Sequence, residues 1–210
     1  MSKDLLIVFV KNLIPGSVKR RLAEDIGMDL AMEVYKELVA ATAEVTDKVK
    51  MDRAIYYSEY VELYDFFDDT KYQKHIQEGK DLGQRMLNAI FDGIENEYDK
   101  VVLIGTDIPE LTPKLINIAF ETLNKHDVVV GPANDGGYYL VGMKDAHNNL
   151  FEGKEYSHDK VHEELVEEAE DAGLSIGLLP TLTDIDTKED MKAVGIEIVY
   201  EDEDDSESLD

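Results

Sequence analysis

The sequence predicts an α/β fold in which a mostly parallel sheet is covered by helices on both faces. Short, continuous apolar runs, such as residues 5–10 and 100–104, have the composition of strands that are buried on both sides. Other segments place apolar residues at every third or fourth position, which is the spacing of an amphipathic helix. Because such strands and helices alternate along the chain, the helices are expected to connect parallel strands.

The expected elements follow one another without an internal repeat or linker. Further strands are expected at residues 53–57, 127–131, 138–143 and 175–179. Helices are expected to begin near Ser17, to cover residues 29–48, 82–94, 159–172 and 187–194, and to open at Thr112-Pro113. Thr112 is a favourable N-cap and Pro113 a favourable first helical residue, whereas Gly173 favours a helix end.

The charge balance is strongly acidic, with 21 Lys and Arg against 47 Asp and Glu and a formal net charge of −26. Such a surface repels nucleic acids and anionic membranes, so neither is expected as a partner. The sequence contains no cysteine, which excludes disulfides, thiol nucleophiles and cysteine-ligated metals. No apolar run approaches the roughly 20 residues that span a bilayer, and we expect a cytoplasmic protein.

We expect one domain at residues 1–199, followed by an acidic tail at residues 200–210. The last ten residues contain seven acids and no base, and few apolar side chains could anchor them. Segments of this composition are typically disordered. In parallel α/β sheets, ligands bind beyond the carboxyl ends of the strands. The residues that follow each strand are therefore the candidates for chemistry.

The segment after the first strand carries four cations, which stand out in so acidic a chain: Lys11, Lys19, Arg20 and Arg21. Gly16 lets the backbone approach a ligand closely, and the helix start that follows offers unpaired N–H groups. Together these features favour an anion site that suits phosphates. The alternative is a solvated basic helix face, and the segment does not have the spacing of a Walker A loop.

Two acidic segments are candidates for a metal site. Asp107 follows the strand at 100–104, where a hard oxygen ligand suits Mg²⁺ or Mn²⁺ beside a phosphate chain; alternatively, it caps the following turn. Asp184 and Asp186 alternate in an extended piece, so their side chains are expected on one side, where they repel each other unless a cation lies between them. Asp186 or Thr187 could also cap the next helix, in a pattern that resembles a capping box.

Two glycine-containing segments are candidates for substrate contacts. Asp135-Gly136-Gly137 is a turn between two strands, and Tyr138 and Tyr139 then point to opposite faces, so one of them could line a pocket. Residues 77–86 place two glycines at a helix start, where the backbone could hold a nucleobase while Arg85 orders an acidic neighbour. The alternatives are an ordinary hairpin and an ordinary capped helix entry.

Five ordered motifs resemble one bacterial and archaeal family over roughly residues 5–194. They read FVKNLIPGSVKRRLA, GKDLGQRM, LIGTDIPELT, GPANDGGYYLVGM and LLPTLTDIDTKEDM. The family was long a domain of unknown function and is called the radical-SAM/selenodomain-associated transferase family. The resemblance implies a Rossmann-like three-layer sandwich of glycosyltransferase A type, among the nucleotide-diphospho-sugar transferases, and kinship with the phospholactate guanylyltransferases.

With this resemblance, we expect particular roles for individual residues. Nucleotide binding is assigned to Lys11, Gly16, Lys19, Arg20, Arg21, Gln77, Gly79, Asp81, Gly83, Arg85 and Thr106. The acceptor is expected to lie against Gly136, Gly137 and Tyr138. Mg²⁺ or Mn²⁺ is assigned to Asp107, Asp184 and Asp186, and catalytic roles to Lys19, Asp107 and Asp135. Three positions depart from the family pattern: Leu13 where proline is usual, Arg20 where threonine is usual, and Tyr156-Ser157-His158 where an aromatic-Ser-Thr segment is usual.

Three functions stay open at this level. The family favours a metal-dependent glycosyltransferase that takes a nucleotide-sugar and a small-molecule acceptor. Three successive cations at residues 19–21 suit a triphosphate, which favours a nucleotidyltransferase that releases pyrophosphate. The third function is nucleotide binding without catalysis. All three place the same acidic and basic residues around one nucleotide.

Overall fold

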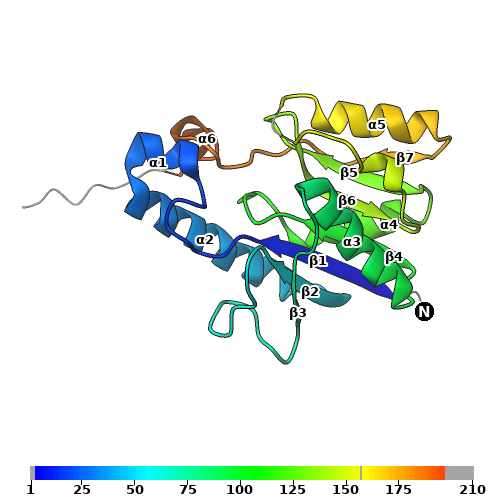
Figure 1. Cartoon of the computed structure of the whole chain (residues 1–210), viewed down its shortest axis with the longest axis horizontal. Helices are drawn as coiled ribbons and strands as arrows, with labels where there is room; N and C mark the ends of the chain where they lie inside the picture. The colour runs from blue at the N-terminus through cyan, green and yellow to red at the C-terminus, as the bar shows by residue number, and fades with distance from the viewer. Residues whose placement is uncertain (1–2, 157, 197–210) are drawn as a thin grey trace, which may run out of the picture.

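The computed structural model describes residues 3–156 and 158–196. The acidic tail that we expect at residues 200–210 lies outside this part of the chain. The described residues form a seven-stranded sheet with helices on both faces (Figure 1). The α/β prediction is thereby confirmed.

The sheet has the strand order β3-β2-β1-β4-β6-β5-β7. The strands are β1 (Asp4–Val10), β2 (Asp52–Tyr57), β3 (Gln73–Ile76), β4 (Lys100–Ile104), β5 (Val128–Pro132), β6 (Tyr138–Met143) and β7 (Ile176–Leu178). β6 pairs antiparallel with both β4 and β5, and the other pairings of the sheet are parallel. The two-strand turn predicted at residues 135–137 therefore exists, and it accounts for the one reversed strand.

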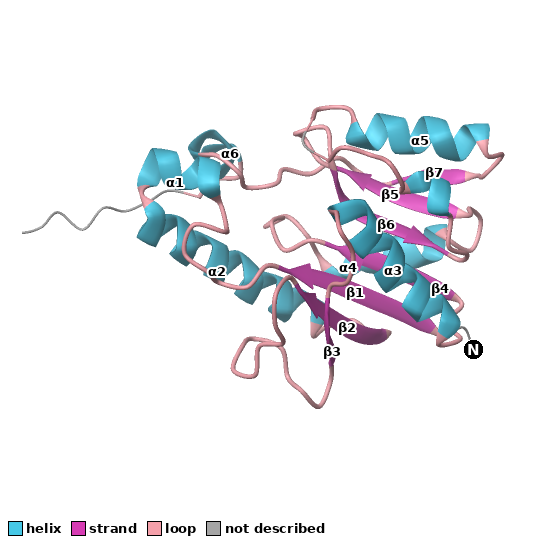
Figure 2. Cartoon of the chain, in the orientation of Figure 1, coloured by secondary structure: helices cyan, strands magenta, loops and turns pink. Residues whose placement is uncertain are grey.

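The helices are α1 (Arg20–Ile26), α2 (Met28–Thr46), α3 (Leu82–Glu95), α4 (Pro113–Thr122), α5 (Val161–Asp171) and α6 (Lys188–Ala193), with a 3₁₀ turn η1 (Asn148–Leu150). α2 and α4 pack on one face of the sheet, and α3 and α5 pack on the other. In Figure 2, α3 lies in front of the sheet and α4 behind it. Leu6 and Val8 of β1 face the first pair of helices, while Leu5 and Ile7 face the second. This alternation explains why the strand is apolar throughout.

The ends of the helices follow local sequence signals. The Thr112 side chain accepts a hydrogen bond from the Leu115 N–H, and Pro113 occupies the first turn of α4. Thr187 and Asp190 form the expected capping box at the start of α6. None of the helices in the described part of the chain combines the length and apolarity needed to cross a membrane. The cap predictions are confirmed because caps depend on residues that are close in sequence.

One strand and the start of one helix differ from the prediction, beyond shifts of one or two residues at other element ends. β3 was not expected, since three of its four residues are exposed and it shows neither an apolar run nor a clear alternation. α1 begins at Arg20 rather than near Ser17, because Lys19 adopts the left-handed conformation (φ 48°) and ends the preceding loop. A left-handed non-glycine residue is held by tertiary contacts, which local sequence does not reveal.

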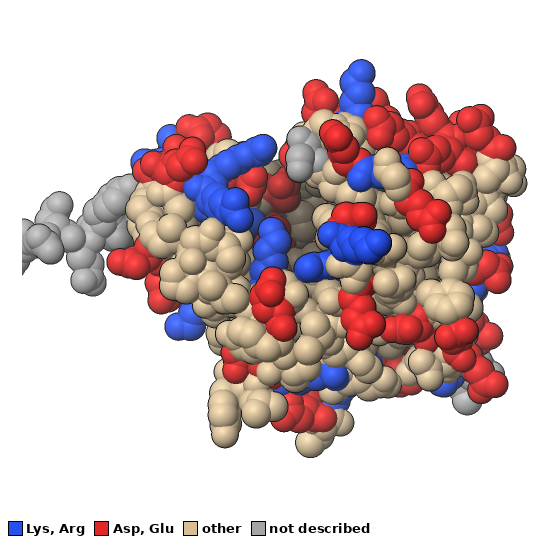
Figure 3. Space-filling view, in the orientation of Figure 1, with Lys and Arg blue, Asp and Glu red and all other residues tan. Residues whose placement is uncertain are grey.

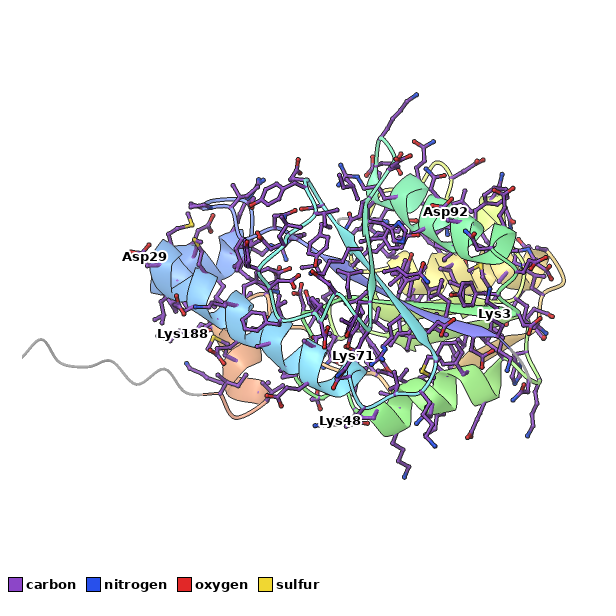
Figure 4. The ribbon with its side chains drawn as sticks, turned by 90° about the horizontal axis from the view of Figure 1, so that it is seen from below. Lys3, Asp29, Lys48, Lys71, Asp92 and Lys188 are labelled. Carbon is purple, nitrogen blue, oxygen red and sulfur yellow. The ribbon has the colours of Figure 1, made fainter. Side chains whose placement is uncertain are left out.

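A small helical lobe lies beyond the carboxyl ends of the strands (Figure 1). It has its own apolar cluster of α1, α2 and α6 side chains with one residue of the preceding loop: Leu22, Ala31, Leu38, Met191 and Ile185. In Figure 4, Asp29 of α2 and Lys188 of α6 lie at this same end of the molecule. The lobe and the ends of the strands enclose the site described next.

Candidate active site

A cavity of about 290 Å³ opens at the carboxyl ends of β1 and β4 and at the turn between β5 and β6. Lys11, Asp107, Asp135 and Asp184 line it, together with apolar and aromatic side chains. Figure 3 shows a hollow on this face, with Lys and Arg side chains around it and acidic side chains inside it. Residues from distant parts of the sequence therefore meet where α/β sheets bind ligands.

Lys19 connects three segments at this site. Its Nζ lies 2.9 Å from Asp107 Oδ2 and donates to the Ile185 carbonyl, while the Ile185 N–H donates to the Asp107 carbonyl at 3.0 Å. The Lys19 side chain is only 4% exposed, whereas that of Asp107 is 38% exposed. A lysine that is buried and left-handed is a costly arrangement, and such strain is concentrated at functional sites.

One carboxylate oxygen of Asp107 has no hydrogen-bond partner among the described residues. This atom, Oδ1, is buried. A buried acceptor without a partner is unfavourable unless a ligand or ion completes it. The hydroxyl of Tyr35 lies close by: it accepts from the Lys11 N–H at 2.9 Å and from the Thr106 hydroxyl at 3.2 Å. Burial, helped by the charge of Asp107, raises the pKa of Tyr35, so this hydroxyl keeps its proton.

Asp135 and Asp184 form an acidic pair at the other side of the cavity. Asp135 Oδ1 accepts a hydrogen bond from the Gly137 N–H at 2.7 Å, which fixes the turn. Burial, followed by the charge of Asp135, raises the pKa of Asp184 from 3.8 to about 6. The charge of Lys19 acts in the opposite direction. An approaching cation would therefore relieve an existing repulsion.

Asp186 has a different environment from Asp184. Its Oδ2 pairs with Arg21 Nη1 at 3.2 Å, and it does not line the cavity. The residues that the structure describes contain no group of three His, Cys, Asp or Glu side chains that could hold an ion. Residues 183–186 are not a strand, so the two-residue period behind the expected arrangement does not apply to them, and a metal role for Asp186 stays a prediction.

Only part of the basic segment after β1 lies at the cavity. Lys11 lines the cavity and Lys19 contacts Asp107, but Gly16, Arg20 and Arg21 are outside the cavity lining. Arg20 Nε donates to the Gly16 carbonyl at 3.2 Å, and the Arg21 side chain is 69% exposed. Gly16 is required by its positive φ of 77° rather than by a crowded contact. The phosphate role of this segment stays a prediction.

The segment before α3 combines a cap with a cavity wall. Asp81 accepts from the Gln84 N–H at 2.8 Å and caps α3, while Arg85 Nε donates to the Gly79 carbonyl at 3.3 Å. Gln77 lines the cavity, and its amide donates to the Tyr56 carbonyl at 2.9 Å. Gly83 instead packs against η1 and the loop after it, since an added Cβ would lie 2.6 Å from the Tyr156 hydroxyl. The helix-entry interpretation is confirmed, and nucleobase binding stays a prediction.

The turn between β5 and β6 presents Gly137 and Tyr138 to the cavity. Tyr138 packs with the α3 and α5 side of the sheet and Tyr139 with the α2 and α4 side, as their alternation predicts, yet both line the cavity. Gly136 is outside the cavity lining. Its carbonyl accepts from the backbone N–H of His162 at 3.0 Å and lies 2.9 Å from His162 Nδ1.

His162 and Tyr35 support the site, and neither was expected from the sequence. His162 holds the turn before β6, and Tyr35 links the ends of β1 and β4. Both lie on amphipathic helices among many other polar side chains. No motif marks such residues, because their partners lie far away in the sequence.

Comparisons with known proteins place this architecture in a family. The model of the family described as "Uncharacterized protein conserved in bacteria (DUF2064)" matches residues 40–158. The chain belongs to the DUF2064 family. It is also similar to a crystal structure from Desulfovibrio desulfuricans G20, named provisionally as a nucleotide-diphospho-sugar transferase, at 33% identity and a TM-score of 0.85. That match covers 92% of this chain and 87% of the other. No curated protein matches the sequence.

More distant structures share the fold of this DUF2064 protein. A 4-diphosphocytidyl-2C-methyl-D-erythritol synthase from Anaerococcus prevotii DSM 20548 is 11% identical, with a TM-score of 0.57 over 91% of this chain and 94% of the other. A Mycobacterium tuberculosis H37Rv protein in complex with manganese is 14% identical, with a TM-score of 0.54 over 92% and 98%. At these identities the likeness shows the Rossmann-like α/β fold alone.

The raised pKa of Asp184 predicts a pH-dependent stability for this DUF2064 protein. An acid whose pKa is higher in the folded state binds its proton more tightly there than in the unfolded chain. Burial of the ionised Asp184 carboxylate therefore lowers the free energy of unfolding above about pH 6. This destabilisation disappears as the pH falls toward 3.8, because the carboxylate becomes protonated in the folded protein. Asp184→Asn should be more stable than the parent at pH 7.5 in EDTA, with a gain that shrinks between pH 6 and 4. Urea unfolding across this range, with Asp186→Asn as control, measures the effect; a gain independent of pH contradicts it.

The turn before β6 predicts a second effect, for Gly136→Ala. Gly136 has a φ of 90°, and an added Cβ would lie 2.0 Å from the Asp159 carbonyl oxygen. Strain and collision together should cost about 1–3 kcal/mol of folding free energy. Gly153→Ala is the matched control, because Gly153 also has a positive φ (74°) but has open space around its Cβ position. Equal melting temperatures of the two variants would show that the contact with Asp159 is unimportant.

Proposed function

We propose that this DUF2064 protein is a metal-dependent glycosyltransferase whose donor is a nucleotide-sugar. The observation that carries the proposal is the Lys19–Asp107 pair, at the ends of the strands, with Asp107 Oδ1 left without a partner. The D. desulfuricans relative, 33% identical, supports a nucleotide-sugar as donor. The radical-SAM-associated transferases that the motifs resemble have the same expected chemistry.

The number of available cations supports a diphosphate donor. Among the residues lining the cavity, Lys11 is the one Lys or Arg side chain, and Lys19 reaches the site from its rim. Arg20 and Arg21 point to other partners. Two lysines suit the charge of a nucleoside diphosphate better than that of a triphosphate. In this proposal Gln77 and the backbone around Gly79 hold the nucleobase.

The residues present fit a hard divalent cation such as Mg²⁺ or Mn²⁺. Asp107 Oδ1 and the carboxylate of Asp184 would hold it, and donor phosphates would complete the oxygen ligands, as is usual for Mg²⁺. When bound, the ion would neutralise charge that develops on the departing diphosphate. The fold neighbour solved with manganese supports this choice of cofactor. Asp186 is not one of the metal ligands in this proposal, because its carboxylate pairs with Arg21.

In the transfer step, side chains of this protein accept a proton and stabilise charge. A nucleophilic atom of the acceptor forms a bond to the anomeric carbon while the bond from that carbon to the diphosphate oxygen breaks. The electron pair leaves with the nucleoside diphosphate, and the acceptor proton passes to Asp135. Lys19 holds positive charge beside the diphosphate. Gly137 and Tyr138 form the wall against which the acceptor lies.

A nucleotidyltransferase is the second candidate. Three successive cations at residues 19–21 and the fold shared with cytidylyltransferases favour it, and kinship with the phospholactate guanylyltransferases would fit it. In that reaction the acceptor attacks the α-phosphorus of a nucleoside triphosphate, and pyrophosphate leaves. A nucleotide-binding protein without catalysis is the remaining alternative.

One screen separates these functions. The melting temperature is measured with nucleoside triphosphates and nucleotide-sugars, each with Mn²⁺ or with EDTA. Binding at a hundredfold excess over Kd stabilises a protein by about 2.7 kcal/mol. We expect the largest rise with a nucleotide-sugar and Mn²⁺, and then release of nucleoside diphosphate, detected by ³¹P NMR. Pyrophosphate release from a triphosphate would favour the second candidate, and no nucleotide binding at all would overturn both.

A further inference from the structure

We infer that the acceptor is an uncharged or cationic molecule with an apolar body, and that it carries neither phosphate nor carboxylate. The inference rests on the proposed function, because it takes the Asp135 side of the cavity as the acceptor end. It concerns a different property, namely the charge and polarity of the second substrate. Three features of that end carry it: its charges, its hydrogen-bond donors and its apolar wall.

The charges at the acceptor end are negative. Asp107, Asp135 and Asp184 line the cavity, and the one Lys or Arg among its lining residues is Lys11, at the end of β1. Asp107 and Asp184 are the residues that would hold the cation, and the cation in turn would contact the donor phosphates. Asp135 would then remain, with the Gly137 N–H as its hydrogen-bond donor. A phosphate or carboxylate placed here would meet like charge, whereas an amine would be attracted.

The hydroxyl donors of the acceptor end are already used. Tyr138 donates to Met86 Sδ at 3.6 Å, Tyr139 to the Pro180 carbonyl at 3.1 Å, and Tyr156 to the Phe151 carbonyl at 3.3 Å. A phosphate ester needs several donors around its oxygens. These three tyrosines can offer it none without breaking a contact within the protein. They offer the cavity their aromatic rings instead.

The remaining wall is apolar. Ile108 and Val161 line the cavity, as the three tyrosines do, and both are buried. Aromatic rings beside a carboxylate attract cations and also accommodate uncharged apolar groups. The combination matches an aliphatic or aromatic body that carries an amine or a hydroxyl as nucleophile. The sugar would be transferred to that atom; a protonated amine would first give a proton to Asp135, which frees the electron pair for attack, and its second proton would pass to solvent.

The test is a binding experiment with charge-matched probes. Arylalkyl amines, the corresponding alcohols and the corresponding phosphate esters are titrated by calorimetry into the full-length protein, with and without Mn²⁺ and the nucleotide selected by the thermal screen. We expect the amines and alcohols to bind at least about tenfold more tightly than the phosphate esters. Equal or tighter binding of the phosphate esters, or no binding of any class, would overturn the inference.

Two variants separate local from general electrostatics. Asp135→Asn keeps an oxygen for the Gly137 N–H and removes the charge, so the preference for amines over phosphate esters should fall roughly tenfold. Glu167→Gln, at an exposed position on α5, removes the same charge outside the cavity and should leave the preference within about twofold. An equal loss in both variants would overturn the role of Asp135.

The two proposals fail in distinguishable ways. The probe series is read without nucleotide as well as with it, so a charge preference can be measured even if no nucleotide binds. Nucleotide-dependent stabilisation with no preference among the probes would overturn the acceptor inference alone. A clear preference with no nucleotide binding would overturn the proposed donor, and with it the assignment of this preference to a transfer reaction.

Discussion

Replacing Asp107 with alanine is expected to lower turnover by roughly 10³-fold and to destabilise the protein. The loss of activity follows because the variant lacks the carboxylate that would hold the cation beside the leaving diphosphate. The loss of stability follows from Lys19, whose buried ammonium group would keep, among the described residues, only the Ile185 carbonyl as a partner. Leaving a buried cation in this way should cost about 1–3 kcal/mol. Product release with saturating Mn²⁺ and urea unfolding in EDTA measure the two effects.

If Asp107 only lay among like charges, its removal would instead be neutral or slightly stabilising. A double-mutant cycle with Lys19→Met decides between them. If the pair stabilises the fold, the double variant should recover part of the stability that Asp107→Ala loses. Asp186→Ala is the matched control, since its partner Arg21 is largely exposed and should tolerate the change. An Asp107→Ala protein that is more stable than the parent, or fully active in EDTA, would contradict the assignment.

Replacing Lys19 with methionine is expected to weaken nucleotide binding by about 10- to 100-fold and to lower the melting temperature as well. If the whole basic segment were a solvated helix face, Lys19 and Arg21 could both be removed without harm to the fold. The structure separates them, because Lys19 is buried and joins the loop after β1 to Asp107 and Ile185, whereas Arg21 is exposed. Buried charge-assisted contacts contribute more than exposed pairs do.

Arg21→Ala is therefore the control for Lys19→Met. It should keep the parent melting temperature and weaken binding less, because Arg21 does not line the cavity. Calorimetric titration with the nucleotide that stabilises the parent most, in Mn²⁺, gives both affinities. Unchanged affinity in Lys19→Met would remove the phosphate role of this segment and strengthen the view of it as a solvated basic helix face.

Much of the site could be predicted because its residues follow strands. β1 and β4 are apolar after their first residue, so their ends were recognisable; Lys11 comes directly after β1, and Asp107 comes three residues after the last residue of β4. Parallel strands bring such ends to one edge whatever the detailed packing. Asp135 and Tyr138 could be predicted in the same way, from a turn whose glycines and acid are adjacent in sequence.

Other residues could not be predicted because their roles depend on partners far away in the chain. Tyr35 contacts the ends of two strands, and His162 contacts a turn 26 residues earlier. β3 owes its existence to pairing with β2 rather than to its own composition. Asp184 lines the cavity, whereas Asp186 pairs with Arg21. Both lie in an irregular loop, where alternation in sequence does not determine the direction of the side chains.

The sequence by itself determined the α/β class, the main strands and helices, the caps at Thr112 and Thr187, and the set of strand-end acids and bases from which a site could be built. These properties depend on periodicity and on neighbours within a few residues, so they are encoded locally. Only the tertiary structure decided that Lys19 is buried against Asp107, that Arg21 engages Asp186, and that Asp135 faces the cavity with Asp184. Those pairings join residues between 49 and 165 positions apart, and side-chain charge alone does not select among them, because 47 acids compete for 21 bases. The apolar cluster of the helical lobe contributes to that selection, because it buries Ile185, which lies between Asp184 and Asp186.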